Sequence, residues 1–263
     1  MNSDDAFSGR YSGIYDLFHE AKPYASEVDF VLGRCLEHSS LRPETVVDLA
    51  CGTGKHLLEF ANRGITVHGN DISAGMLAET QRRLDAAKTK SFSLSKSPMQ
   101  SLTVKSPAPE QFDLATAFYT AMGYLVAPQD LDALMRNLQN LLKPGGFFFA
   151  DLWNGHKMTT QFSPHREKTA ENEFIQVLRR SDVSSEAKQN ALRVKFSFDL
   201  LTKKTGVRET FNEEHCVRYH TVPEVENILL AHGFSLLEHG PYFDEATTTE
   251  TSWNFYVLAR RRD

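Results

Sequence analysis

The chain has 263 residues, enough for one large domain or two small ones with a fully buried core. Its formal net charge of -5 argues against nucleic-acid binding, because nucleic-acid binders usually present a basic face. The composition, 41% hydrophobic and 24% charged, is that of a globular protein, and no apolar run is long enough to cross a bilayer. A polar start predicts no signal peptide. Cys35, Cys51 and Cys216 form no CxxC pair, so we expect no disulfide framework and a cytoplasmic location.

The first 152 residues alternate between helical and strand patterns. Apolar residues at helical spacing predict two helices within residues 11–38, separated by Pro23. Ser73 is a plausible N-cap, and Gly64 is placed to end a helix. This alternation at close spacing is typical of a parallel, doubly wound sheet. The expected strands are 45–49, 65–69, 91–94, 112–118 and 147–152, and the expected helices that follow the first strand are 55–63, 73–88 and 128–142.

After residue 152 the pattern becomes β-rich. Segments 174–180, 192–201 and 207–219 alternate in polarity and are joined by polar turns, which predicts an antiparallel meander. A helix at 223–232 and a strand pair at 234–238 and 254–260 follow. Because no repeat or long linker separates the meander, we interpret it as an insertion into an α/β fold.

The most informative motif is Asp-Leu-Ala-Cys-Gly-Thr-Gly at residues 48–54, where the first strand turns into a helix. Glycines there let the backbone approach a ligand, and open α/β sheets bind ligands at this position. A nicotinamide fingerprint needs a third glycine where this chain has Leu57, and the P-loop pattern is absent. Asp48 would repel a pyrophosphate but suits an ammonium or sulfonium group.

These residues resemble motif I of the class I S-adenosylmethionine-dependent methyltransferases. Three further motifs match in order: Val-His-Gly-Asn-Asp-Ile-Ser at 67–73, Phe-Asp-Leu at 112–114, and Leu-Leu-Lys-Pro-Gly-Gly at 141–146. The resemblance implies a seven-stranded Rossmann-like sheet, with the β-meander inserted after strand 5. It also implies S-adenosylmethionine as cofactor, S-adenosylhomocysteine as product, and no metal.

The resemblance implies a cofactor site around the first three strands, with Asp71 taking the ribose hydroxyls. One position departs from the family pattern: Pro98 stands where many members place an acid against the adenine, and Gln100 is a possible substitute. The implied cofactor-binding residues are Tyr15, Tyr24, Asp48, Ala50, Cys51, Gly52, Gly54, Asp71, Ile72, Met76, Met99, Gln100 and Phe118.

The N-terminal aromatic residues and segment 118–125 resemble small-molecule members, in particular the nucleotide-sugar N-methyltransferases and the glycine and sarcosine N-methyltransferases. We therefore expect methyl transfer by in-line displacement to an amine nitrogen of a small-molecule acceptor. One alternative is an O-methyltransferase with a histidine as general base. Others are a non-catalytic cofactor-binding scaffold and a nicotinamide-dependent oxidoreductase. The base-methylation motif of nucleic-acid enzymes is absent, and we expect neither nucleic acid nor membrane as a partner.

Candidate residues for catalysis and for acceptor binding come from both ends of the chain. Arg179, Arg193 and Arg218 could bind an acidic acceptor, but solvated charges on the strands are the better explanation of all three. The expected organisation is a helical lid at 1–44, a cofactor core at 45–152, a β insertion at 153–222 that forms the acceptor pocket or a homodimer contact, and a completing segment at 223–263. The catalytic candidates are Tyr15, His19 and His215, and the substrate-binding candidates are Tyr119, Met122, Trp153 and Arg218.

Overall fold

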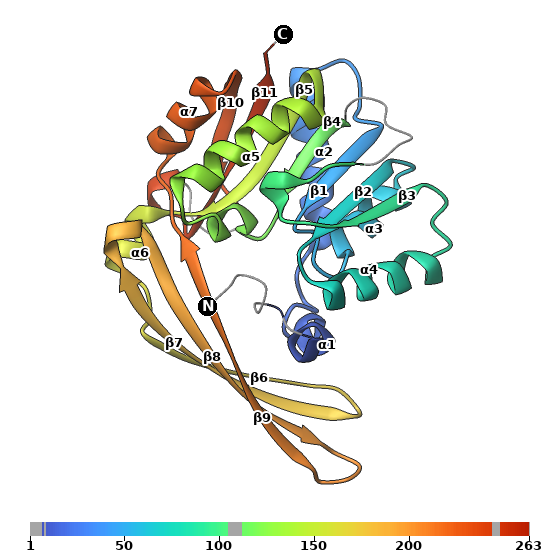
Figure 1. The fold of residues 1–263 in the computed structure, drawn as a ribbon, viewed down its shortest axis with the longest axis vertical. Coiled ribbons are helices and arrows are strands. Elements are labelled where there is room, and N and C mark those ends of the chain that lie inside the picture. Colours follow the sequence, from blue (N-terminus) through green and yellow to red (C-terminus); the bar gives the residue numbers. More distant parts are fainter. Residues whose placement is uncertain (1–6, 8, 105–111, 244–247, 263) are drawn as a thin grey trace.

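The computed structural model describes residues 7, 9–104, 112–243 and 248–262. Its core is a seven-stranded sheet in the order β10-β11-β5-β4-β1-β2-β3 (Figure 1). The strands from β5 to β3 in this order run parallel, whereas β11 is antiparallel to both β5 and β10. This confirms the predicted doubly wound sheet. Its strands are β1 (Thr45–Leu49), β2 (Thr66–Asp71), β3 (Phe92–Lys96), β4 (Phe112–Ala117), β5 (Leu142–Trp153), β10 (Phe234–Pro241) and β11 (Asn254–Arg261).

Helices cover both faces of this sheet, as a sheet with strands buried on both sides requires. Helices α5 and α7 bury their apolar residues against one face, and α2 and α3 bury theirs against the other. The predicted N-cap is confirmed, because the Ser73 hydroxyl accepts a hydrogen bond from the Met76 backbone N–H at 3.3 Å. The helices are α1 (Gly9–Phe18), α2 (Tyr24–His38), α3 (Lys55–Asn62), α4 (Ala74–Ala86), α5 (Pro128–Leu141), α6 (Gly155–Thr160) and α7 (Val222–Ala231).

The segment Lys-Pro-Gly-Gly at 143–146 lies between the predicted helix 128–142 and the predicted strand 147–152, but the structure includes it in β5. It forms the irregular start of β5, where the register with β4 shifts between Phe112 and Leu114. Gly145 lies within it at φ 74°, a left-handed conformation that glycine adopts at little cost. The bend that the sequence predicts is therefore present as a bulge inside the strand.

A second, four-stranded antiparallel sheet follows β5 and extends below the core in Figure 1. The predicted meander is confirmed, but it has one strand more than the sequence predicts. The additional strand, β6, carries the sequence His-Arg-Glu-Lys-Thr-Ala-Glu and is almost wholly exposed, so no apolar alternation marks it. The strands of this sheet are β6 (His165–Glu171), β7 (Ile175–Glu186), β8 (Ala191–Thr202) and β9 (Arg208–Arg218).

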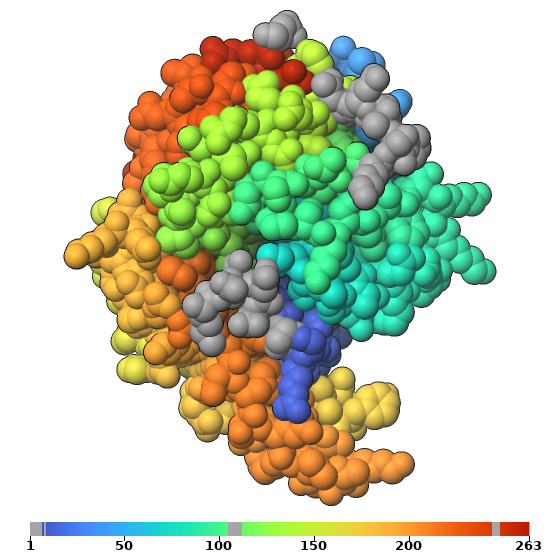
Figure 2. Space-filling model, viewed as in Figure 1, coloured from blue at the N-terminus to red at the C-terminus, as the bar shows by residue number. Residues whose placement is uncertain are grey.

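Helix α1 joins the core to the second sheet. Its buried residues Tyr11, Ile14 and Phe18 pack against Val177 of β7 and Phe198 of β8. Its other side contacts α4. Figure 2 shows α1, in dark blue, between the core helices and the orange strands. Helix α1 therefore packs between the core helix α4 and the second sheet.

Candidate functional site

A cavity of about 570 Å³ lies at the carboxyl ends of the central strands, between the core sheet, α1 and the second sheet. Its volume is within the range of small-molecule sites. It has two parts. The first, which we call the glycine half, is lined by the ends of β1, β2 and β3; the second, the aromatic half, is lined by α1 and by β7, β8 and β9.

The glycine half begins at the turn after β1. Ala50, Gly52 and Gly54 have φ values of 54°, 57° and 77°, so the backbone reverses sharply within five residues. A Cβ atom built on Gly54 would lie 2.5 Å from Thr80 Cγ2, which leaves no room for a side chain. A Cβ on Gly52 would meet nothing within 4 Å, and Gly52 lines the cavity. The turn thus leaves open space over its backbone for a ligand.

Asp71 ends β2 beside this turn. One carboxylate oxygen accepts the Gly52 backbone N–H at 2.9 Å, and the other accepts the Ser73 N–H at 2.8 Å. Burial raises the pKa of Asp71, and these backbone N–H groups lower it in part. Both oxygens keep lone pairs that can accept hydroxyl donors. Asp71 also stands 19 residues after Gly52, close to the spacing at which dinucleotide-binding folds hold a ribose.

The side of the glycine half that follows β3 contains an acid, Asp130, which was not predicted from the sequence. Pro98, Met99 and Gln100 line the cavity, and so does Asp130 from the first turn of α5. The Gln100 side-chain amide donates to Asp130 Oδ1 at 3.4 Å. Asp130 is far in sequence from the other residues of the glycine half. Acidic residues are also common in the first turn of a helix, so nothing near Asp130 in the sequence marks it as a site residue.

Asp48 lies beneath the turn rather than at the cavity surface. It is 1% exposed, and its Oδ1 accepts the Thr116 hydroxyl at 2.7 Å. Burial, with a smaller contribution from the nearby Asp71, raises the pKa of Asp48 to about 7 although the Thr116 hydrogen bond lowers it in part. The structure therefore does not place Asp48 in contact with the cavity, and its visible role is to join β1 to β4.

This raised pKa has a consequence for stability. A carboxyl group whose pKa is higher in the folded state stabilises the protein below its unfolded pKa, and that contribution is lost as pH rises through the folded pKa. From pH 5 to pH 8 we expect Asp48 to cost roughly 3 kcal/mol of unfolding free energy. Asp48→Asn should therefore lose less stability than the wild type over this interval in denaturant titrations. Parallel pH profiles for the two proteins would contradict this.

Phe118 and Tyr119 lie on the floor of the cavity, just after β4. The Phe118 ring stacks on the buried His56 ring at 3.9 Å, and His56 Nε2 lies 2.7 Å from Glu27. Tyr119 has φ 58°, and its backbone N–H donates to Asp151 Oδ1 at 2.5 Å. These bonds hold the floor in one conformation.

The aromatic half brings together the three catalytic candidates. His19 stacks on Tyr15 at 4.2 Å, and its Nδ1 donates to the Tyr15 carbonyl at 2.7 Å, which leaves Nε2 as an acceptor. His215 is 3% exposed, its Nδ1 lies 3.2 Å from the Tyr124 hydroxyl, and its Nε2 has no hydrogen-bond partner among the described residues. Burial lowers the pKa of both histidines to about 4, so both are neutral at pH 7.

Other predicted site residues divide into those at the cavity and those outside it. Tyr15, Ala50, Gly52, Asp71, Ile72, Met76, Met99, Gln100, Phe118, Tyr119 and Trp153 line it. Tyr24, Asp48, Cys51, Gly54, Met122 and Arg218 do not. The expectation that Met122 and Arg218 contact substrate is therefore corrected: Met122 is fully buried in the core, and Arg218 pairs with Glu224 at 2.5 Å. Tyr24 packs its ring against His56 at 4.8 Å, outside the cavity.

Of the three arginines considered from the sequence, only Arg179 lines the cavity. Its guanidinium lies between the Phe18 and Phe196 rings, 4.7 and 4.8 Å from their centroids. Among the described residues it forms no ion pair with a carboxylate, whereas Arg193 pairs with Glu186 at 2.7 Å. Strand alternation predicts that Arg179 and Arg180 face opposite sides, but not which side faces α1.

A family profile described as a methyltransferase domain matches residues 46–146. The dTDP-3-amino-3,4,6-trideoxy-alpha-D-glucopyranose N,N-dimethyltransferase of Streptomyces venezuelae is 28% identical over 247 residues, 88% of this chain and 93% of that protein. The match to the dTDP-3-amino-3,6-dideoxy-alpha-D-glucopyranose N,N-dimethyltransferase of Streptomyces fradiae, 29% identical, covers 56% of this chain and about half, 54%, of that protein.

Residues 46–146 therefore form a methyltransferase domain. A crystal structure of an S-adenosylmethionine-dependent methyltransferase from Clostridium acetobutylicum has the same fold as this chain, with a TM-score of 0.79, 20% identity, and coverage of 97% of this chain and 98% of that one. In the part of the chain that the structure describes, no group of His, Cys, Asp or Glu side chains could hold a metal ion. Within the same residues, no helix has the length and apolar character needed to cross a membrane.

Proposed function

We propose that this methyltransferase methylates an amine nitrogen of a small-molecule acceptor. The observation that carries this proposal is a single cavity that joins a glycine turn and a buried carboxylate to an aromatic half with two neutral imidazoles. The relatives from Streptomyces are named for N,N-dimethylation of amino sugars, which supports an amine as the acceptor.

In this proposal the glycine half holds the cofactor. The residues present fit it, because the turn leaves room above Gly52 and Asp71 offers lone pairs to ribose hydroxyls. Met99 and Gln100 would face the adenine, and Asp130 would accept its exocyclic amine in place of the acid absent at Pro98. S-adenosylmethionine, when bound, supplies a methyl group that is activated by a sulfonium.

The aromatic half would bind the acceptor and receive its proton. An amine attacks through its lone pair, so it must be neutral, and alignment can then supply most of the catalysis. The His19 Nε2 lone pair is available because Nδ1 donates to the Tyr15 carbonyl. The neutral ring of His215 lies on the same wall and is the second candidate to accept a proton.

The positive charge of Arg179 in the aromatic half favours an acceptor that carries an anionic group. Arg179 has no carboxylate partner among the described residues, and the aromatic half has no lining carboxylate in the same part of the chain. A phosphate or carboxylate on the acceptor would form a charge-assisted hydrogen bond with the Arg179 guanidinium. Its positive charge would also disfavour the ammonium form of the acceptor amine and so favour the reactive free base.

The test is incubation of the purified enzyme with methyl-labelled S-adenosylmethionine and matched pairs of acceptors, amino sugar nucleotides against their hydroxyl counterparts. We expect labelled N-methyl product from the amine and little from the hydroxyl compound. Efficient methylation of the hydroxyl compound, abolished by His19→Gln or His215→Gln, would instead favour the O-methyltransferase. Absence of S-adenosylmethionine binding in calorimetry would contradict both.

We further propose that the division at 1–44, 45–152, 153–222 and 223–263 corresponds to lid, cofactor core, acceptor insertion and completing segment. The cysteines are free, and Cys35 and Cys51 are buried, which is consistent with a reducing, cytoplasmic environment. A homodimer through the edge of the second sheet stays a prediction, which sedimentation would check.

A further inference from the structure

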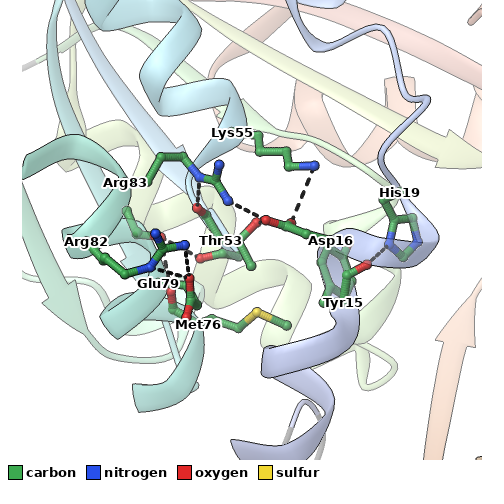
Figure 3. Close-up of polar contacts among 11 residues, drawn as sticks. Tyr15, Asp16, His19, Thr53, Lys55, Met76, Glu79, Arg82 and Arg83 are labelled. Atoms are coloured by element: carbon green, nitrogen blue, oxygen red, sulfur yellow. Dashed lines mark hydrogen bonds and ion pairs between the residues drawn. The ribbon is translucent and has the colours of Figure 1, made fainter. Parts of the chain in front are cut away.

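Helix α1 is attached to the glycine turn by one carboxylate, that of Asp16. Its Oδ1 accepts the Thr53 hydroxyl at 2.7 Å and lies 3.7 Å from Lys55 Nζ. Its Oδ2 pairs with the Arg83 guanidinium of α4. Figure 3 shows Thr53 and Lys55 from the glycine turn and Arg83 from α4 converging on Asp16.

Two of the three partners of Asp16 belong to the turn that forms the glycine half, and the third, Arg83, bonds to that turn as well. Thr53 and Lys55 stand on either side of Gly54. The Arg83 Nε also donates to the Thr53 carbonyl at 2.9 Å. Arg83 therefore binds both the backbone of the turn and the Asp16 carboxylate. One network therefore sets the position of the turn relative to α1 and α4.

The place of Asp16 on α1 connects this network to the aromatic half. Tyr15 immediately precedes it, and His19 follows three residues later, near the end of the helix; both line the cavity. The rest of α1 contacts the second sheet mainly through apolar side chains, together with a hydrogen bond from Lys168 Nζ to the Phe18 carbonyl at 2.8 Å and an exposed Arg10–Glu209 pair at 3.4 Å. Whereas these contacts hold α1 to the second sheet, the Asp16 carboxylate bonds to the glycine turn, so it is placed to set the orientation of Tyr15 and His19 relative to that turn.

We propose that Asp16 is a positioning residue for methyl transfer, which holds α1 on the glycine turn and so couples cofactor binding to the alignment of Tyr15 and His19. This inference rests on the proposed use of the cavity. The side chain of Asp16 is 33% exposed and those of Lys55 and Arg83 are 18% and 19% exposed, so the network is accessible to salt. An isolated pair of this exposure contributes little, but three donors on one carboxylate act together.

The experiment compares Asp16→Ala, Asp16→Asn and Thr53→Val with Glu79→Gln as a matched control. Glu79 pairs with Arg82 on the exposed side of α4, beside the network in Figure 3 but with no contact to the turn. We expect Asp16→Ala to raise the S-adenosylmethionine Kd about tenfold in calorimetry and to lower kcat at saturating cofactor. Asp16→Asn and Thr53→Val, which keep more of the contacts, should show smaller effects in the same direction, and Glu79→Gln none.

Two further measurements separate positioning from structural support. Salt should weaken cofactor binding by the wild type more than by Asp16→Asn, because only the wild type keeps the charged pair. In hydrogen exchange, Asp16→Ala should expose the amides of α1 while those of α5 stay protected. A lowered Tm with unchanged Kd and kcat in all Asp16 variants would overturn the proposal.

Failure of the proposed function is distinguishable from failure of this inference. If the wild type itself bound no S-adenosylmethionine, the proposed function would fall, and this inference with it. If the wild type bound cofactor and methylated an amine, but Asp16→Ala did both equally well, only the positioning role would be overturned.

Discussion

Gly54→Ala is expected to abolish cofactor binding and to lower the free energy of unfolding by roughly 2–4 kcal/mol. The new Cβ would lie 2.5 Å from Thr80 Cγ2 and 2.9 Å from Thr80 Oγ1, at a φ of 77° that disfavours any L side chain. Thr80 cannot withdraw freely, because it is fully buried and its hydroxyl donates to the Gly52 carbonyl at 2.7 Å. The backbone of the turn would therefore have to shift to make room for the new methyl group. Calorimetry and denaturant titration measure the two effects.

Gly64→Ala is the matched control for this change. Gly64 has nearly the same φ, 79°, but a Cβ there would meet nothing within 4 Å, and it does not line the cavity. We expect it to cost only about 1 kcal/mol and to leave S-adenosylmethionine affinity unchanged. If Gly54→Ala bound cofactor as well as Gly64→Ala does, the close contact with Thr80 would not govern the site.

Arg179→Met is expected to raise the acceptor KM about 10- to 100-fold, the loss anticipated when one charge-assisted contact to an anion is removed. Methionine keeps apolar contact with Phe18 and Phe196 while removing the charge, so the effect isolates electrostatics from packing. Cofactor Kd should be unchanged, because Arg179 belongs to the aromatic half. Steady-state kinetics with the cofactor saturated provide the measurement.

Arg180→Met is the control on the same strand. Arg180 is exposed and pairs with Glu167 at 2.8 Å, away from the cavity. It should leave the acceptor KM unaltered, and Arg179→Lys should recover part of the affinity. An acceptor KM that Arg179→Met leaves unchanged would contradict the assignment of an anionic acceptor.

Much of the core was predictable because its signals are local. The β-branched run at 45–49 is the strand β1, Ser73 caps α4, and the motif order from 48 to 146 follows the sheet. These features depend on a few neighbouring residues and on period-2 or helical spacing. The same locality explains the confirmed strand pair at the C-terminus.

Other parts of the cavity were less predictable because contacts between distant segments of the chain define them. Strand β6 has no buried face to impose a pattern, and Asp130 reaches the cavity because α5 packs against the turn at Met99–Ser101 that follows β3. Arg179 could not be separated from Arg193 by sequence, since only the docking of α1 makes one face of the second sheet an inner wall. Asp48 is the first residue of the motif at 48–54, yet it is buried beneath the cavity surface, and the spacing of the motif does not show how deeply a residue is buried.

The second sheet contributes its wall residues in strict alternation: Arg179, Ser181 and Val183 from β7, Leu192, Val194 and Phe196 from β8, and His215 and Val217 from β9. Each points inward from a backbone whose hydrogen bonds are already made to neighbouring strands. A mutational library confined to these positions would reshape the wall while leaving the ladder and the cofactor turn intact. If the aromatic half binds the acceptor as proposed, such a library would change acceptor preference, whereas the buried members, Leu192 among them, would also report the stability cost of each change.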